Sequence, residues 1–224
     1  MSDTRVYVDM ELRDGETVTL PESAYRHLVV VLRRIRGDTV TLFNGYGGEF
    51  EAVLESVKRD GVNARLTAFR DVNRESPLHI TLAQAVSKGE RMDYTIQKAV
   101  ELGVTEIQPL ITDHVVVKLD EERWMRKQEH WQSVAIAACE QSGRTRVPHI
   151  ARVLDLRDWL NTAPVETLRL LLAMDAPSVL GERPRTPGIA LQHRHAAGGS
   201  RALATARDRS QSRHRHDSPR QGTA

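Results

Sequence analysis

The chain has 224 residues, of which 40% are hydrophobic, and a formal net charge of +2. Domains mostly hold about 100–150 residues, so this length predicts one ordinary domain with a small partner domain. The longest uncharged apolar stretches, such as residues 170–173, are far shorter than the roughly 18 residues that cross a bilayer, which excludes a membrane-spanning protein. Acidic side chains near the N-terminus stand where a secretory signal would have its apolar core, and we expect a cytoplasmic protein.

Cysteine and charge patterns narrow the function further. Cys139 is the single cysteine, which excludes an internal disulfide and a multi-cysteine metal site, and its alanine-rich surroundings predict a buried hydrophobe rather than a nucleophile. We expect no metal. The small net charge does not by itself indicate a nucleic-acid-binding protein, but the basic residues are clustered. The clusters are Arg33 with Arg34 and Arg36, Lys88 with Arg91, and Arg144 with Arg146.

The first 70 residues have a strand-rich pattern with one helix. Pro21 is a good opening residue for a helix over residues 22–34, and Gly37 follows as a break. Strand-like runs then cover residues 39–43, 50–57 and 62–68, separated by glycine-containing turns. Short strands joined by such turns predict a small β-barrel.

Residues 71–77, DVNRESP, are polar and end in proline, which is typical of a linker between domains. From Leu78 onward strands alternate with helices, the pattern of a parallel sheet with crossover connections. We expect strands at 78–86, 104–110, 115–117 and 168–173, and helices at 91–102, from the Asp120 cap to Ser142, and around 156–160. The sequence therefore predicts an α/β domain.

The composition changes after about residue 188, where Phe, Trp, Tyr, Val and Met no longer occur. So little apolar area cannot offset an ordering entropy of roughly 1–2 kcal/mol per residue, and we expect a disordered tail. An out-of-frame reading of a GC-rich gene would produce this Arg/His/Ser-rich end, and we hypothesise such an origin. The predicted division is 1–72, 73–187 and 188–224.

The block SKGERMDYTIQKAVELGV begins with Lys88, Glu90 and Arg91 between a predicted strand and a predicted helix. Ligands in α/β sheets bind outside the carboxyl ends of strands, and a helix N-terminus offers N–H groups to phosphate. RNA backbone or a transfer pocket is one interpretation of these residues. A solvated turn whose charges have no special task is the other.

A second block, AIAACEQSGRTRVP, places Glu140, Gln141, Arg144 and Arg146 at the end of the long helix. Such a polar cluster can contact RNA phosphates and base edges, although arginines near a helix C-terminus also stabilise the helix dipole. His27, Arg33 and Arg34 form a third basic group beside the predicted barrel. They indicate RNA binding only modestly, because a solvated helix face would carry the same residues.

On these blocks the chain resembles the bacterial 16S rRNA (uracil-N3) methyltransferases of the SPOUT superfamily. The resemblance runs from about residue 5 to 172 and follows the family order of barrel, linker, KGE block, tryptophan-bearing helix and EQSGR block. It implies a PUA-like N-terminal β-barrel followed by a SPOUT α/β trefoil-knot methyltransferase domain. It also implies S-adenosylmethionine as cofactor, 16S rRNA in the small ribosomal subunit as partner, no membrane partner, and a homodimer.

The resemblance assigns roles to residues without naming a catalytic base. The expected RNA-binding residues are His27, Arg33, Arg34, Lys88, Arg91, Arg144 and Arg146. The expected pocket-shaping residues are Glu90, Glu140 and Gln141. The expected cofactor-binding residues, at the end of a strand, are Leu172, Ala173 and Met174.

The chain departs from the family at its C-terminal part. The glycine loop resembling GPEGG and the segment resembling LGxRxLRxETA, which form the knot, wrap the cofactor and make much of the dimer interface, do not occur. His114 stands where the family tends to have arginine. Two hypotheses therefore stay open: a methyltransferase whose end is frameshifted, and a non-catalytic RNA-binding remnant with an incomplete SPOUT domain. We expect the chain as written to be inactive.

Overall fold

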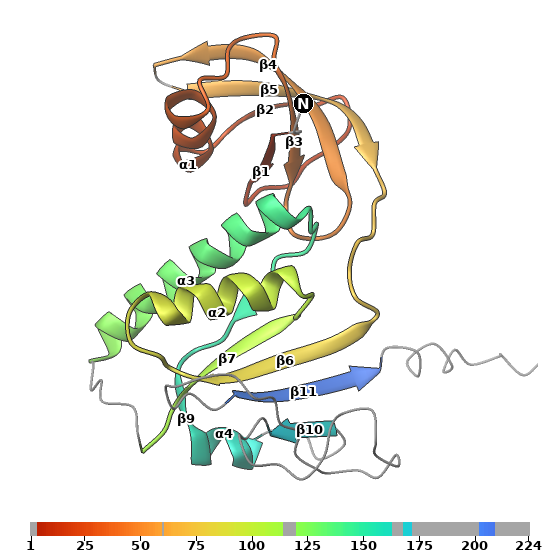
Figure 1. The fold of residues 1–224 in the computed structure, drawn as a ribbon. Helices are drawn as coiled ribbons and strands as arrows, with labels where there is room; N and C mark the ends of the chain where they lie inside the picture. The colour runs from red at the N-terminus through yellow and green to blue at the C-terminus, as the bar shows by residue number, and fades with distance from the viewer. Residues whose placement is uncertain (1–3, 60, 114–119, 163–167, 172–201, 209–224) are drawn as a thin grey trace, which may run out of the picture.

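The structure is a computed structural model that describes residues 4–59, 61–113, 120–162, 168–171 and 202–208. Figure 1 shows an N-terminal sheet above a second sheet, with two long helices lying between them. Residues 71–77 connect the two parts without regular structure. The expected α/β class is confirmed, and the polar linker is where the pattern changes from strands alone to strands and helices.

The N-terminal sheet has five strands in the order β1-β3-β4-β5-β2, with β1 parallel to β3 and the other pairs antiparallel. Its strands are β1 Arg5–Tyr7, β2 Thr17–Thr19, β3 Thr39–Phe43, β4 Glu49–Lys58 and β5 Gly61–Arg70. Alternate side chains such as Leu42, Leu54 and Leu66 point into one fully buried core. The expected strands at 39–43, 50–57 and 62–68 are confirmed. Among the described residues the pairings form an open path rather than a closed ring.

The expected helix over residues 22–34 is shorter and irregular. Helix α1 spans Glu22–Tyr25, and a π-helix, η1, continues over Arg26–Val31. Three consecutive valines in this segment disfavour a regular α-helix, because β-branched side chains crowd the preceding turn. Arg33, which lies beyond the helix, has a φ of +54°. The prediction was therefore wrong for the last turn, and Val30, Val31 and Ile35 are exposed there.

The second sheet is mixed. Its order is β10-β11-β6-β7-β8, with β9 also pairing with β7. The parallel strands are β6 Leu78–Ala85, β7 Glu106–Ile111, β8 His149–Ile150 and β9 Leu154–Asp155. Strand β10, Leu168–Leu171, is antiparallel to β11, which is antiparallel to β6. The strand expected at 115–117 lies outside the described residues.

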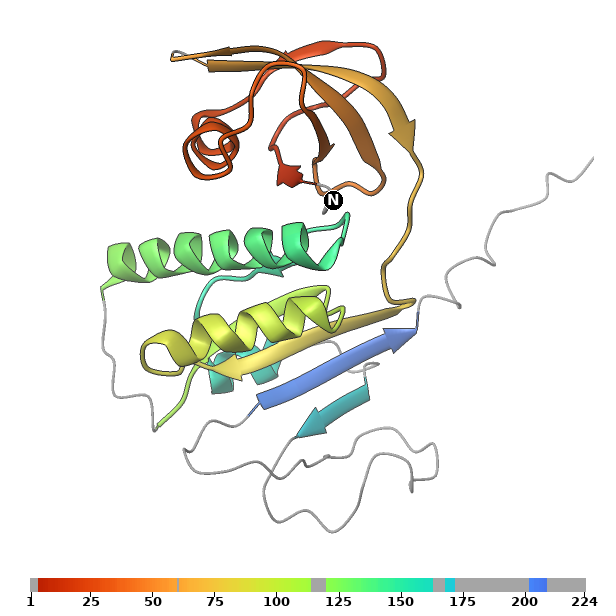
Figure 2. The same ribbon diagram turned by 45° about the horizontal axis from the view of Figure 1, so that its top comes forward.

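Strand β11 spans Ala202–Asp208 and lies between β10 and β6 (Figure 2). The expectation of disorder is wrong for these seven residues. Strand pairing uses backbone groups that every non-proline residue has, and β11 is paired along both edges. The composition argument considered side-chain burial alone and missed this contribution. The rest of the expected tail lies outside the described residues.

Helices α2, Glu90–Glu101, and α3, Glu121–Ser142, cover the face of the second sheet that points toward the N-terminal sheet (Figure 1). Asp120 caps α3 as expected, since its side chain accepts a hydrogen bond from the Arg123 backbone N–H at 2.8 Å. Gly143 ends α3 with a φ of +79°. The core below α3 is built around Trp131, which is 2% exposed. The short helix α4, Leu156–Thr162, packs on the opposite face of the sheet through Trp159.

No helix in the described ranges is both long and apolar enough to span a bilayer.

The end of α3 reaches the N-terminal sheet, where the backbone N–H of Tyr7 donates a hydrogen bond to Glu140 Oε1 at 3.0 Å. The β3–β4 loop contacts the chain just after α3. A side chain at Gly47 would touch the Arg146 guanidinium, and one at Gly48 would overlap the Phe69 ring.

We predict that Gly48→Ala lowers the free energy of unfolding by about 2–4 kcal/mol, because it adds overpacking against Phe69 to the strain of a positive φ. Gly15→Ala is the matched control. Its φ of +77° is similar to the +69° at Gly48, and a Cβ there meets nothing within 4 Å. Urea unfolding of both variants measures the difference. Equal losses of stability would show that Phe69 does not restrict this loop.

Candidate functional site

A pocket of about 570 Å³ lies where the N-terminal sheet meets the end of α3. We call it the junction pocket. Both parts of the chain line it, and the lining residues are Thr4, Arg5, His27, Leu32, Arg34, Glu49, Arg70, Arg74, Glu140, Gln141, Ser142 and Gly143. The structure therefore brings together four of the residues predicted from sequence, namely His27, Arg34, Glu140 and Gln141.

A buried carboxylate lies at the base of this pocket. Glu49 is 1% exposed and forms ion pairs with Arg5, with Arg74 at 3.0 Å and with Arg70 at 3.3 Å. Burial has the largest single effect on the pKa of Glu49 and raises it, but hydrogen bonds and charges from Arg74 and Arg5 together outweigh it and lower the pKa. Glu49 is thus held ionised. Sequence reasoning missed these residues because they are scattered over 70 positions and share no local motif.

Two of these arginines, Arg5 and Arg74, also bind the end of α3. Arg5 donates a hydrogen bond to the carbonyl oxygen of Arg144 at 3.0 Å, and Arg74 donates one to the carbonyl oxygen of Gly143 at 3.0 Å. Carbonyl oxygens at a helix C-terminus carry partial negative charge and attract cations. Arg5 and Arg74 therefore connect the carboxylate of the first sheet to the last turn of the long helix.

Arg144, expected to bind RNA, is instead a buried structural residue. It is 4% exposed, forms an ion pair with Glu75 through two nitrogens, and donates to the carbonyl oxygens of Val100 at 3.0 Å and Val104 at 2.8 Å. Its donors are occupied by protein acceptors away from solvent, so the expected contact with RNA does not fit this placement. The side chain joins the linker to the ends of α2 and α3.

Arg146 and Arg33 have the opposite environment. The Arg146 side chain is exposed beside Gly47, while its backbone N–H donates to Glu75 Oε1 at 3.3 Å. Arg33 is exposed on the segment after η1, next to the junction pocket but not in its lining. Both guanidinium groups are placed to meet an anion from solvent.

A second basic group lies at the other end of α2. Lys88, Glu90 and Arg91 are exposed where β6 ends and α2 begins. The 12 residues of α2 span about 18 Å, and its far end contacts Arg144. The predicted RNA-binding residues therefore divide into two groups. Leu172, Ala173 and Met174, the expected cofactor contacts, follow β10 and lie outside the described residues.

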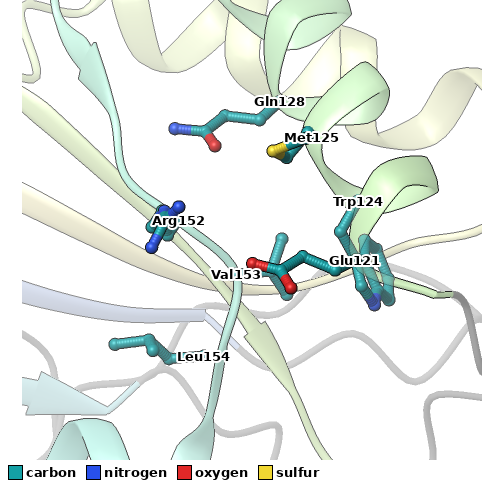
Figure 3. Close-up of a pocket in the computed structure, with 7 residues that line it drawn as sticks. All are labelled: Glu121, Trp124, Met125, Gln128, Arg152, Val153 and Leu154. Carbon is teal, nitrogen blue, oxygen red and sulfur yellow. The ribbon is translucent and has the colours of Figure 1, made fainter.

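A smaller pocket of about 360 Å³ lies beside the first turns of α3. Figure 3 shows Glu121, Trp124, Met125 and Gln128 of the helix facing Arg152, Val153 and Leu154 across an open space. The Gln128 amide is oriented by its hydrogen bond to the carbonyl oxygen of Ile150 at 2.8 Å. Because Leu154 pairs with Leu110, this pocket is near the carboxyl end of β7. The walls combine the apolar side chains of Trp124, Met125, Val153 and Leu154 with the polar side chains of Glu121, Gln128 and Arg152.

The described residues hold no cluster of three or more His, Cys, Asp or Glu side chains that could bind a metal ion. Cys139 lies on the buried face of α3, as predicted, and burial raises the pKa of its thiol to about 12. A thiol with this pKa stays protonated at neutral pH and is a poor nucleophile. In the described residues, the groups best placed to bind a ligand are therefore the basic side chains and the two pockets.

We predict that Glu49→Gln lowers the free energy of unfolding by about 3 kcal/mol at pH 7, since it removes the buried counter-charge of Arg5, which is largely buried, and of the more exposed Arg70 and Arg74. Because the pKa of Glu49 is lowered in the folded protein, its stabilisation is present above the unfolded pKa of about 4.3 and is lost as pH falls through the folded value. The difference between wild type and variant should therefore shrink on acidification below about pH 4. Urea unfolding from pH 7 to pH 3 measures it.

Glu51→Gln is the control for Glu49→Gln. It lies on the same strand and pairs with Arg70 at 3.3 Å, but its side chain is 43% exposed. An exposed pair contributes about 0–1 kcal/mol, so the control should unfold nearly as the wild type does. Equal effects of the two substitutions would contradict a special role for Glu49.

Replacement by methionine should lower the stability of the protein at Arg144 but leave it nearly unchanged at Arg146. We predict that Arg144→Met costs on the order of 3 kcal/mol of stability, because Glu75 is left buried and unpaired. Arg146→Met should change stability by less than about 0.5 kcal/mol, as is usual at exposed positions. Thermal and urea unfolding check both. An Arg144→Met protein as stable as the wild type would contradict the structural role of Arg144 and would make this residue a candidate for ligand binding again.

The sequence matches a family described as "RNA methyltransferase domain" over residues 74–187, half of the chain. Among curated relatives, the ribosomal RNA small subunit methyltransferase E of Buchnera aphidicola is 27% identical over 180 residues, covering 80% of this chain and 73% of the relative. The protein of the same name from Bacillus subtilis is 32% identical over 149 residues, covering 66% and 57%. The Synechocystis protein is 35% identical and covers 69% and 50%. The chain thus spans between half and about three quarters of the length of these relatives.

Solved structures agree with this result. A ribosomal RNA small subunit methyltransferase E from Neisseria gonorrhoeae, bound to S-adenosylmethionine, superposes with a TM-score of 0.78 at 38% identity and covers 85% of this chain and 78% of that one. A Legionella pneumophila protein described as a methyltransferase, also in complex with S-adenosylmethionine, gives a TM-score of 0.79 at 38% identity, with coverage of 86% and 79%. The matched region contains the KGE block, the long helix and the EQSGR block. On this evidence the chain belongs to the RNA methyltransferase domain family.

Proposed function

We propose that this protein transfers a methyl group from S-adenosylmethionine to N3 of a uridine in 16S rRNA of the small ribosomal subunit. The observation that carries the proposal is the family match over residues 74–187, together with 38% identity to two structures that hold S-adenosylmethionine. The curated relatives are named for methylation of small-subunit ribosomal RNA. The KGE and EQSGR blocks support uracil N3 as the target only through the resemblance to the uracil-N3 methyltransferases that they carry.

The described part of the second sheet supports a cofactor site at its carboxyl edge. Strands β6 and β7 run parallel and end side by side, with Ala85 opposite Leu110. Ligands of parallel sheets bind outside such ends. Ala85, Val86 and Leu110 are buried there and offer an apolar wall. When bound, S-adenosylmethionine supplies an activated methyl group. We assign Leu172, Ala173 and Met174, which follow β10, to its binding.

The basic residues would hold the RNA. We assign the N-terminal sheet, as a PUA-like domain, to RNA binding through His27, Arg33 and Arg34, with Arg146 on the adjoining surface. Lys88 and Arg91, with Glu90 between them, lie at the carboxyl edge where the methyl group is transferred. Helix α2, about 18 Å long, separates Lys88 and Arg91 at its start from the residues near its end, so the two groups would contact different nucleotides of the RNA.

Methyl transfer requires that the target uracil is unstacked from its neighbours in the RNA. It also requires that N3 of this uracil loses its proton. Unstacking costs a few kcal/mol, which contacts to the flanking phosphates must offset. Holding the two reactants in a productive geometry supplies much of the acceleration of a transfer reaction, and no catalytic base is assigned. We therefore expect Lys88 and Arg91 to act by positioning RNA.

We further propose that the protein acts in the cytoplasm as a homodimer. Size-exclusion chromatography with light scattering would test the homodimer.

The test of this function is a methyl-transfer assay on the full chain. Small ribosomal subunits that lack the modification are incubated with radiolabelled S-adenosylmethionine, and 16S rRNA is then digested to nucleosides. The sequence alone led us to expect an inactive chain, but the similarity to two structures that hold S-adenosylmethionine favours activity, and we expect label in 3-methyluridine. Lys88→Gln and Arg91→Gln should each lower kcat/KM about tenfold or more, because a hydrogen bond to a charged group contributes about 1.5–3 kcal/mol.

Arg65→Gln is the control for these variants, since Arg65 is exposed on β5 and its ion pair with Glu55 is long, at 4.0 Å. RNA binding without any label transfer at saturating S-adenosylmethionine would sink the catalytic proposal. It would favour the non-catalytic RNA-binding alternative. Label in a nucleoside other than 3-methyluridine would keep the enzyme and change its target.

A further inference from the structure

Helix α2 presents a large aromatic side chain to solvent near the carboxyl edge of the second sheet, where we place methyl transfer. Tyr94 is 64% exposed and lies one helical turn, about 6 Å, from the first residue of α2. Arg91 is exposed three residues before it, so the two side chains are neighbours on the helix surface. An aromatic ring is thus placed beside a basic group, in a position to which no role has been assigned above.

The orientation of the Tyr94 ring is supported by the next turn of its own helix. The Lys98 ammonium lies over the ring at 5.8 Å from its centroid, within the range of a cation–π interaction. Glu101 Oε2 accepts a hydrogen bond from this ammonium at 2.7 Å, and Gln97 donates to Glu101 Oε1 at 3.0 Å. Among the described residues no second cation and no other aromatic ring interacts with Tyr94. The ring is therefore oriented while most of its surface stays exposed, which lowers the entropy cost of placing a ligand against it.

The charges around Tyr94 balance one another. With His130, the partner of Asp93 at 2.8 Å, counted as neutral, the positive groups are Lys88, Arg91 and Lys98, and the negative groups are Glu90, Asp93 and Glu101. Electrostatic attraction alone therefore binds RNA only weakly on this face of α2. Stacking of a base on an aromatic ring does not depend on net charge and is a large contribution to the binding of single strands.

We propose that Tyr94 is a stacking platform for a nucleobase of the RNA and positions the strand relative to the carboxyl edge of the second sheet. The identification of the ligand as RNA rests on the proposed function. Proteins recognise single-stranded RNA by stacking its splayed bases on aromatic side chains, and every base has a face that can stack. Because Tyr94 lies one turn away from the edge, the stacked base is a neighbour of the target uracil and not the target itself. Tyr94 is thus a positioning residue, and its contact tolerates different bases.

The first experiment measures binding of single-stranded RNA by the full chain. A fluorescein-labelled oligouridylate is titrated at several KCl concentrations. We expect Tyr94→Leu to weaken binding about tenfold, as the loss of one stacked base does, and Tyr94→Phe, which keeps the ring, to bind as the wild type does. The salt dependence separates stacking from charge. Tyr94→Leu should leave the slope of log Kobs against log[salt] unchanged, whereas Arg91→Gln should reduce its steepness by about 0.7, the contribution of one phosphate contact.

Leu102→Ala is the matched control. Leu102 is 84% exposed and directly follows α2, about two turns beyond Tyr94, so the substitution removes exposed apolar area from the same helix without removing a ring. It should bind RNA as the wild type does, and thermal unfolding confirms that each variant is folded. Equal losses of binding in Leu102→Ala and Tyr94→Leu, or in Tyr94→Phe and Tyr94→Leu, would overturn the proposal.

A second measurement detects the stacked base directly. The fluorescent base 2-aminopurine replaces each uracil of the oligouridylate in turn, and its emission falls when it stacks on an aromatic ring. At saturating protein, the wild type and Tyr94→Phe should quench the emission at one or more positions at which Tyr94→Leu does not. Equal quenching by all three proteins at every position would place the bases on another surface and would overturn the proposal.

The outcomes separate this proposal from the proposed function. Methyl transfer to 16S rRNA, with equal RNA binding by the wild type and Tyr94→Leu, would leave the enzyme intact and remove the stacking platform. Ring-dependent binding and quenching without any methyl transfer would establish the platform and remove the catalytic assignment. A wild type that does not bind single-stranded RNA at all would overturn the platform whatever the result of the transfer assay.

Discussion

The arrangement of the two parts depends on a buried carboxylate and the arginines around it. Glu49 comes from β4, Arg5 from β1 and Arg74 from the linker, and the two arginines extend from Glu49 to carbonyl oxygens at the end of α3. Positive charge is thus placed between a carboxylate and the negative end of a helix dipole. This interaction fixes the angle at which the N-terminal sheet meets the long helix, and with it the walls of the junction pocket.

A second buried pair, Glu75 with Arg144, acts on the other side of the linker. Arg144 also binds carbonyl oxygens at the end of α2, so the linker, α2 and α3 are held at one point. Both ion pairs use arginine as a bridge between an acid and carbonyl oxygens at or just beyond a helix C-terminus. Buried ion pairs of this kind are expensive to break, which favours a single orientation of the two parts. A single orientation keeps the walls of the junction pocket, which come from both parts, in place.

The sequence predicted the local elements well where local chemistry decides them. Helix α3 begins after Asp120 and ends at Gly143 as expected, because a capping side chain and a left-handed glycine act within a few residues. Strand β3 has the predicted bounds. The helix over residues 22–34 was predicted as regular but contains a π-helix, since Leu28 has to stay buried while three valines crowd the turn. Strand β11 was missed because its partners β6 and β10 are distant in sequence.

The sequence by itself determined the family, the order of the elements and the presence of basic clusters, because these are encoded by residue types at short spacing. The tertiary structure alone decided which basic residues are available to a ligand. Arg144 and Arg146 are two positions apart, yet one is buried against Glu75 and the other is exposed, and no local pattern distinguishes them. The junction pocket likewise joins Arg5, Arg34 and Gln141 from distant segments. Burial and long-range ion pairing depend on how distant parts of the chain pack, which short-range spacing does not specify.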